Sequence, residues 1–295
     1  MTTDVSVPKA SNLALYATAD DDFAQMRQRD IIMPNLRLMQ PLSPLVVKQK
    51  VGSAGDFSVP ATQEIIVPTG KIGKIVPLQF WLEWIEWNPN KRAGKNGNTE
   101  KIIIERSNDP TSNLAKRAER FEKITVEGKD RVAVTEYYNF ICAFADEVDG
   151  IKDYSRLFVI NFSKTSHRTG KQFLNRLNNC KITVDDGEGG KTRVKAPIWA
   201  NEWEIFSKVE ENDDKESYYV IQIGSNSAVD TKHHETLFSQ HALLKSRRDE
   251  IRNANTAANA DDTEGESGAA KPDTSATSAG VTGKEKTTVK DEPPF

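Results

Sequence analysis

Residues 52–87 read GSAGDFSVPATQEIIVPTGKIGKIVPLQFWLEWIEW. This stretch is dense in Val, Ile, Phe and Trp and is interrupted by Gly and Pro, a composition typical of short β-strands separated by turns. A polar interval, WNPNKRAGKNGN at 87–98, separates it from a second strand-like run, EKIIIER at 100–106. The region therefore predicts a β-hairpin with a long tip.

The segment on the N-terminal side, residues 31–51, also reads as extended chain. Its prolines, at positions 34, 41 and 44, argue against a helix and favour extended or edge structure. Leu36 and Leu38 alternate with Arg37, the period-two pattern of a half-buried strand. We expect the folded body to begin here.

Downstream, apolar and β-branched runs predict further strands, and periodic apolar residues predict helices. A short polar helix is expected at 111–123, and a helix at 165–178 has an apolar face of Phe173, Leu174 and Leu177. A final helix at 228–252 has four candidate inward positions, namely Val229, Leu237, Leu244 and Ile251. The expected strands lie in RVAVTEYYNFICAFA (131–145), SRLFVINFS (155–163), KITV (181–184), TRVKAPIWANEWEIFSKVE (192–210) and SYYVIQIG (217–224).

This order predicts a mainly β fold with a few helices. A Greek-key, OB-like barrel with elaborated loops fits, because many short strands need closure to hide their edges, and a β-sandwich is compatible with the same pattern. We expect a flexible arm at 1–30, a body at 31–252 that ends in a helix, and a disordered tail at 253–295. From Thr256 onward the tail holds eight acids against four bases, about −4, whereas the body is about +3.

Several classes of protein are not expected. No apolar run is long enough to span a bilayer, and the N-terminus lacks the pattern of a secretory signal. Cys142 and Cys180 are expected to be reduced thiols in a soluble, cytoplasmic protein. The glycine-rich stretch 70–74 lacks the spacing of a phosphate loop, and no nucleophile or metal-ligand pattern appears. We therefore expect a binding protein without a cofactor rather than an enzyme.

Aromatic residues interleaved with basic ones are the main functional signal. Strand alternation places Trp81 and Trp87 on one face and Trp84 on the other, and Trp84 is the strongest candidate for the core. Tyr138 shares a face with Phe140, which leaves Tyr137 on the opposite face. Trp81, Trp87 and Tyr137 are the candidate platforms for stacking nucleic-acid bases, although any one of them can instead be a core residue.

Basic residues near these aromatic residues are candidates for phosphate contacts. Three follow Trp87 in the hairpin tip, and four belong to or flank the helix expected at 165–178, where a solvated helix face is the equally plausible alternative. The candidates are Lys91, Arg92, Lys95, Lys164, Arg168, Lys171 and Arg176.

The last five residues, Asp291, Glu292, Pro293, Pro294 and Phe295, combine acids, prolines and an aromatic ring. Proline limits the entropy lost on binding, the ring can fill an apolar pocket, and the acids can meet Lys or Arg around it. These residues are the candidate partner-docking tip.

Several segments resemble those of tailed-phage single-stranded DNA-binding proteins, and the tip resembles the acidic, phenylalanine-ended tip of such proteins. The resemblance implies an OB-like core and binding of single-stranded DNA (ssDNA) during phage replication or recombination in an infected host cell. It also implies recruitment of replication or recombination proteins through the tip, and a homo-oligomer is compatible with it. The alternative is a phage structural or assembly protein whose tail is a solubilising arm. The segments are MPNLRLMQPLSPLV (33–46), AGDFSVP (54–60), IVPLQFWLEWIEW (75–87), RLFVINFSKTSHRTGKQFLNRL (156–177) and APIWANEWEI (196–205).

Overall fold

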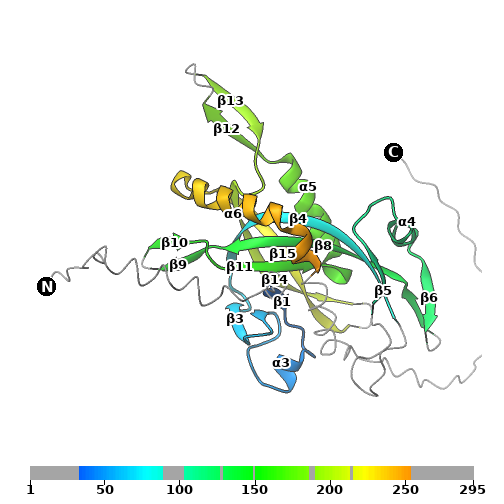
Figure 1. Cartoon of the computed structure of the whole chain (residues 1–295). Helices are drawn as coiled ribbons and strands as arrows, with labels where there is room; N and C mark the ends of the chain where they lie inside the picture. The colour runs from blue at the N-terminus through cyan, green and yellow to red at the C-terminus, as the bar shows by residue number, and fades with distance from the viewer. Residues whose placement is uncertain are drawn as a thin grey trace, which may run out of the picture.

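The computed structural model of the chain describes residues 33–88, 103–126, 129–148, 150–185, 190–212 and 215–253. Nine of the described strands form one sheet that curls into a half-barrel (Figure 1). The order across the sheet is β15 (Ser217–Ala228), β14 (Asn201–Glu211), β4 (Gly73–Trp87), β8 (Val134–Phe144), β11 (Leu157–Phe162), β1 (Asn35–Leu38), β2 (Phe57–Val59) and β3 (Glu64–Val67), and β5 (Ile103–Ser107) pairs with β4.

Three two-stranded hairpins and several helices complete the described part of the chain. The hairpins pair β6 (Lys123–Val126) with β7 (Lys129–Val132), β9 (Asp146–Val148) with β10 (Ile151–Asp153), and β12 (Lys181–Asp185) with β13 (Lys191–Lys195). The α-helices are α3 (Pro44–Val47), α4 (Asn113–Glu119), α5 (His167–Asn179) and α6 (His234–Ser246), and the 3₁₀ turns η2 (Lys164–Ser166) and η3 (Thr231–His233) precede α5 and α6.

The long antiparallel pair of β4 and β8 forms the centre of the sheet. Its register runs from Ile75 opposite Phe144 to Glu86 opposite Val134 and shifts between Pro77 and Gln79. Proline has no N–H to give to the ladder, so an irregularity at Pro77 lets a central strand accommodate it. Beyond the bulge, odd-numbered residues of β4 lie opposite odd-numbered residues of β8, and their side chains share one face.

The curl brings the two ends of the sheet together beside β1. β1 lies parallel to β11, with Asn35 opposite Val159, and it is the parallel member of an otherwise antiparallel sheet. Just after β1, the side-chain amide of Gln40 donates to the carbonyl of Tyr219 at 2.9 Å and accepts from its backbone N–H at 2.9 Å. Gln40 thus acts like one residue of an extra strand and ties β1 to β15.

The sheet is covered on both faces, because neighbouring residues of β8 enter different cores. Phe140 and Cys142 pack in the first core, to which α5 adds Phe173 and Leu177. Ile141 and Ala143 belong to the second core, on the opposite face. Its other members include Trp81 and three of the residues expected to face inward from the last helix, namely Val229, Leu237 and Leu244, and the fourth, Ile251, is partly buried against it.

A third, smaller cluster packs α4 against the sheet. Trp84 is buried there with Leu114, Ala115 and Val134, as expected for a core tryptophan. The hydroxyl of Ser112 caps α4 by accepting from the N–H of Ala115 at 3.2 Å.

The sequence predicts most of these elements, and the mainly β fold with a few helices is confirmed. The expected hairpin is present as β4 and β5, and Leu36 and Leu38 are buried along β1. Two details were wrong. Pro44 begins the short helix α3 instead of excluding one, because proline is tolerated in the first turn of a helix. Ala228 ends β15, so the final helix starts later than expected.

Candidate functional site

A cavity of about 620 Å³ opens on the sheet face that carries Trp87. Its floor comes from adjacent strands β4, β8 and β11, and its walls come from β1 and the residues after it, from η2, and from the start of β15 with residues just before it. The cavity size lies within the roughly 300–1,000 Å³ typical of small-molecule sites.

Two aromatic side chains meet at this cavity. The indole Nε1 of Trp87 donates a hydrogen bond to the hydroxyl of Tyr137 at 3.1 Å. The two ring centroids are 6.5 Å apart and the ring planes meet at 63°. Both residues are half-buried and line the cavity, so two of the three predicted stacking platforms come together.

Two asparagine side chains also line the cavity. Asn139 of β8 lies directly opposite Asn161 of β11 in the sheet. Asn139 is only 3% exposed. Within the described ranges, Nδ2 of Asn139 and Oδ1 of Asn161 are buried and have no hydrogen-bond partner.

The charged residues around the cavity balance one another. Arg37 and Lys164 are the bases, whereas Glu83 and Glu216 are the acids. A carboxylate oxygen of Glu83 lies 3.9 Å from Nη1 of Arg106 on the neighbouring strand β5. Aromatic and amide groups therefore characterise the cavity more than an excess of charge does.

Trp81 does not line the cavity, although it lies opposite Asn139 in the sheet. It is 6% exposed and packs in the second core, next to residues of α6. It does share a face with Trp87, as strand alternation predicts, but α6 covers that face at its position. Because the Trp81 ring is buried, it is not exposed for stacking on a base.

The predicted phosphate contacts divide into three groups. Lys91, Arg92 and Lys95 lie outside the described residues. Lys164 lines the cavity, and Arg168 and Lys171 are exposed on α5. Arg176 is instead bound by the protein itself, as described next.

The guanidinium of Arg176 contacts three groups of the protein. It donates to the carbonyl of Ile223 at 2.9 Å and to the carbonyl of Gly224. It also lies over the ring of Trp203, 4.6 Å from the centroid. These contacts assign Arg176 a structural role between α5 and β15, which differs from the predicted phosphate contact.

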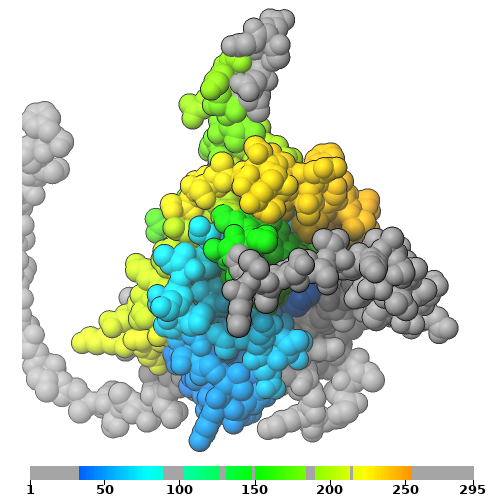
Figure 2. Space-filling view, turned by 90° about the vertical axis from the view of Figure 1, so that its left-hand side faces the viewer, coloured from blue at the N-terminus to red at the C-terminus, as the bar shows by residue number. Residues whose placement is uncertain are grey.

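The sequence patterns did not predict one basic surface, on the β12–β13 hairpin. The β12–β13 hairpin projects from the body in both views (Figures 1 and 2), and every residue of β13 is exposed. Register pairs Lys181 with Lys195, so these two lie on one face with Lys191 and Arg193. The sequence holds a signal for this surface. Basic residues alternate with other residues in KTRVK (191–195), which follows the strand-like KITV (181–184).

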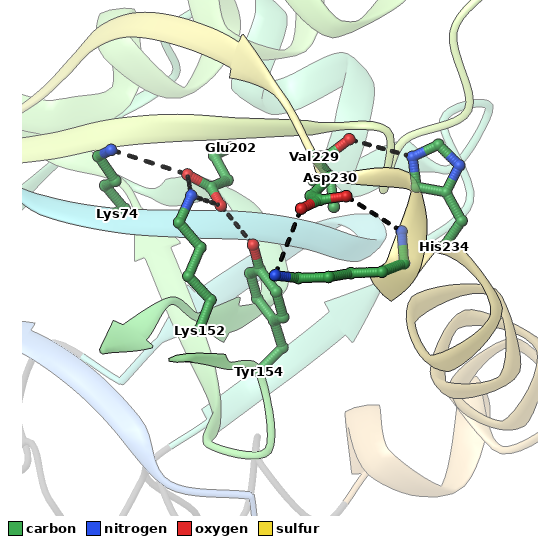
Figure 3. Close-up of polar contacts among 8 residues, drawn as sticks. Lys74, Lys152, Tyr154, Glu202, Val229, Asp230 and His234 are labelled. Atoms are coloured by element: carbon green, nitrogen blue, oxygen red, sulfur yellow. Dashed lines mark hydrogen bonds and ion pairs between the residues drawn. The ribbon is translucent and has the colours of Figure 1, made fainter. Parts of the chain in front are cut away.

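A buried carboxylate forms a separate polar cluster (Figure 3). Glu202 of β14 is 1% exposed, and its carboxylate accepts hydrogen bonds from Lys152 at 2.6 and 2.9 Å and from the hydroxyl of Tyr154. Lys74 approaches the same carboxylate to 3.8 Å. Burial opposes the charge of Glu202, but the hydrogen bonds from Lys152 and Tyr154 outweigh it, so the pKa of this carboxyl lies below its ordinary value. The cluster ties the β9–β10 hairpin to the sheet.

Within the described residues, no cluster of His, Cys, Asp and Glu is placed to hold a metal ion. The described helices also include none that is both long and apolar enough to cross a membrane. The predicted docking tip, Asp291 to Phe295, lies outside the described residues.

The family model of Pam3 phage gp34-like proteins matches residues 3–249. The chain belongs to this family. Membership in it confirms the phage affiliation that the resemblance implied. Membership of the gp34-like family does not by itself assign an activity, so ssDNA binding stays a prediction. No curated protein and no solved structure matches the chain.

Proposed function

We propose that this phage protein binds single-stranded DNA without strict sequence specificity. The proposal depends on one observation: Trp87, Tyr137 and Lys164 line the same cavity, and Trp87 is hydrogen-bonded to Tyr137. Base stacking on aromatic rings works for every base, and a neighbouring cation offsets the phosphate charge. These are the groups that such binding needs.

Cations beyond the cavity would extend the contact along the DNA backbone. Arg168 and Lys171 are exposed on α5, and the cationic face of the β12–β13 hairpin stands free of the body. Lys91, Arg92 and Lys95 are proposed to contribute from the segment that follows Trp87. The curled sheet is accordingly proposed to serve as an OB-like barrel, a fold in which a strand face binds nucleic acid.

The acidic tail is proposed to have two roles in phage replication or recombination. It would compete weakly with DNA for the basic surfaces, since its charge is only about −4. Its tip would recruit replication or recombination proteins, with Phe295 in an apolar pocket and Asp291 and Glu292 beside basic residues. DNA binding would release the tail and so couple loading to recruitment.

The second candidate is a structural or assembly protein of the phage particle. The sheet order favours it, because β3 stands at one end of the sheet and strand edges can pair with other chains. This function predicts ordered assemblies without DNA.

One titration separates these functions. Fluorescein-labelled ssDNA is bound at two salt concentrations and then competed with unlabelled single-stranded or duplex DNA of the same sequence. The proposal expects tight binding, preference for the single strand, and weakening at the higher salt. Preference for duplex, or no binding at low salt together with assemblies of the protein alone, overturns the proposal.

A further inference from the structure

Three adjacent strands place polar side chains side by side along the cavity. Glu83 of β4 lies opposite Tyr137 of β8, and the next pair on the same face joins Trp81 to Asn139. Asn139 in turn lies opposite Asn161 of β11. Same-face neighbours in a sheet are close enough to act on one small ligand. A carboxylate and two amides thus form a continuous polar strip beside the Trp87–Tyr137 pair.

The two amides have hydrogen-bonding capacity that the described protein does not use. A buried donor on Asn139 and a buried acceptor on Asn161 are both unpartnered. Leaving such groups unpaired is costly, and native proteins rarely do so without a reason. A half-turn about the last side-chain bond exchanges oxygen and nitrogen in each amide, so the pair can offer a donor and an acceptor in either order.

Glu83 restricts which ligand suits the strip. An ionised carboxylate accepts hydrogen bonds and donates none. It therefore favours a ligand edge that carries an amino group and disfavours one that carries only carbonyl oxygens nearby. Carboxylates pair with the amino group of cytosine in this way.

We propose that the cavity is a pocket for a single unstacked nucleobase bearing an exocyclic amino group next to a ring nitrogen, as in cytosine or adenine. Asn139, Asn161 and Glu83 bind the edge of the base, and Trp87 and Tyr137 contact its face. This inference rests on the proposed ssDNA binding and adds to it a base preference at one position. Stacking and phosphate contacts elsewhere still allow the protein to bind any sequence.

Oligo(dC) and oligo(dT) of equal length are the matched probes, because both bases are pyrimidines and differ at the amino or carbonyl group. Affinities are measured by fluorescence anisotropy at one fixed salt concentration. Wild-type protein should bind oligo(dC) about fivefold tighter than oligo(dT), or better, the size expected of one good base-edge contact.

Three variants test the strip, namely Asn139→Leu, Asn161→Leu and Glu83→Gln. Each should bring the affinities for oligo(dC) and oligo(dT) to within about twofold of each other, because the contact that distinguishes the amino group from the carbonyl group is lost. Leucine has a similar volume and leaves no polar group unpaired, so the fold should persist, and thermal melting checks this. Ser58→Ala is the control, because Ser58 of β2 is also buried with an unpartnered hydroxyl and does not itself line the cavity, although it lies opposite Arg37, which does.

The outcomes separate the two proposals. Equal wild-type affinities for oligo(dC) and oligo(dT), or a preference that persists in the folded variants, overturn the base pocket and leave ssDNA binding standing. Failure to bind either oligonucleotide overturns ssDNA binding and the base pocket with it. A preference lost in the strip variants and kept in Ser58→Ala supports the pocket.

Discussion

The indole nitrogen of Trp87 donates a hydrogen bond to the hydroxyl of Tyr137, fifty residues further along the chain. The bond joins neighbouring strands β4 and β8 and sets the two ring planes at 63° to each other. Because one ring fixes the other, neither loses much freedom when a ligand arrives. Such a preorganised pair suits base stacking.

Removal of either ring should weaken binding to ssDNA. For Trp87→Ala and for Tyr137→Ala we expect a loss of about 1–3 kcal/mol, the value of one base stacked on an aromatic ring. Tyr137→Phe keeps the ring and removes the hydroxyl that accepts from Trp87, so its loss should be smaller. Fluorescence anisotropy with a labelled oligonucleotide measures all three.

Trp81→Phe is the matched control for these ring variants. Trp81 lies on the same strand face but is buried in the second core. Its replacement should lower the melting temperature and leave the affinity of the folded protein intact. An equal loss of affinity in Trp81→Phe and Trp87→Ala would count against a stacking site at the cavity.

Salt dependence should distinguish free cations from structural ones. Each phosphate contact on a single strand contributes about 0.7 to the slope of log affinity against log salt. Lys164→Ala should lower that slope by about 0.7, and a triple alanine variant of Lys191, Arg193 and Lys195 by about 2. An unchanged slope in the triple variant would remove the hairpin from the DNA contact.

Arg176→Ala should behave differently from Lys164→Ala. Its guanidinium binds backbone carbonyls of β15 and stacks on Trp203, so the variant loses contacts within the fold. We expect a lower melting temperature and a slope like that of the wild type. If Arg176→Ala instead keeps the wild-type melting temperature and lowers the slope of log affinity against log salt, Arg176 contacts phosphate after all.

The buried carboxylate of Glu202 should matter for stability. Glu202→Gln leaves Lys152 without its counterion and should cost about 2 kcal/mol of unfolding free energy, a usual value for hydrogen bonds to a charged group. Tyr154→Phe removes one bond to the same carboxylate and should cost about 1 kcal/mol. Urea unfolding compares both variants with the wild type. If neither variant changes the free energy of unfolding, the cluster is dispensable for stability.

Acid should selectively weaken the contact between β4 and α4. Arg117 donates two hydrogen bonds to Glu86, at 2.7 and 2.8 Å, and these lower the pKa of the Glu86 carboxyl below its ordinary value of 4.5. A lowered folded pKa stabilises the protein above pH 4.5, and the stabilisation is lost as the pH falls through the folded pKa.

The variant Glu86→Gln tests this pH dependence, because glutamine does not ionise. At neutral pH we expect it to melt at a lower temperature than the wild type. The difference should shrink as the pH falls below 4.5, since the wild-type carboxyl then becomes protonated. A difference that stays constant across this range would mean that ionisation of Glu86 contributes nothing.

Deletion of residues 291–295 should separate docking from DNA binding. Affinity for ssDNA is expected to stay the same or rise, because two acids of the competing tail are removed. Capture of a replication or recombination protein by the immobilised tail should be lost. Weaker ssDNA binding by the shortened chain would contradict the two roles proposed for the tail.

Local patterns predicted much of the fold because they depend on residues close in sequence. The period of Leu237 and Leu244 placed one face of α6 in the core, and the alternation of Leu36 and Leu38 marked β1. The burial of Trp81 was not foreseeable in the same way. It depends on α6, whose position over β4 results from tertiary packing and leaves no trace in the β4 sequence.

The candidate site was predicted in part. The sequence predicted both Trp87 and Tyr137 as stacking platforms. It did not predict their contact, which follows from the register of β4 and β8. Asn139 and Asn161 were missed because a single asparagine in a strand has no signature of its own. Their significance arises only when β8 and β11 pair and leave both amides at one cavity.

The parallel pairing of β1 with β11 has a consequence for how the chain acquires its structure. On the ribosome β1 emerges more than a hundred residues before β11, and Gln40 emerges 179 residues before its partner Tyr219. The first strand must therefore wait, unpaired on that side, until most of the body has been synthesised. Contacts so distant in sequence slow folding and prolong the exposure of strand edges. A circular permutation that places β1 after β15 shortens these sequence separations and should therefore accelerate refolding of the complete chain.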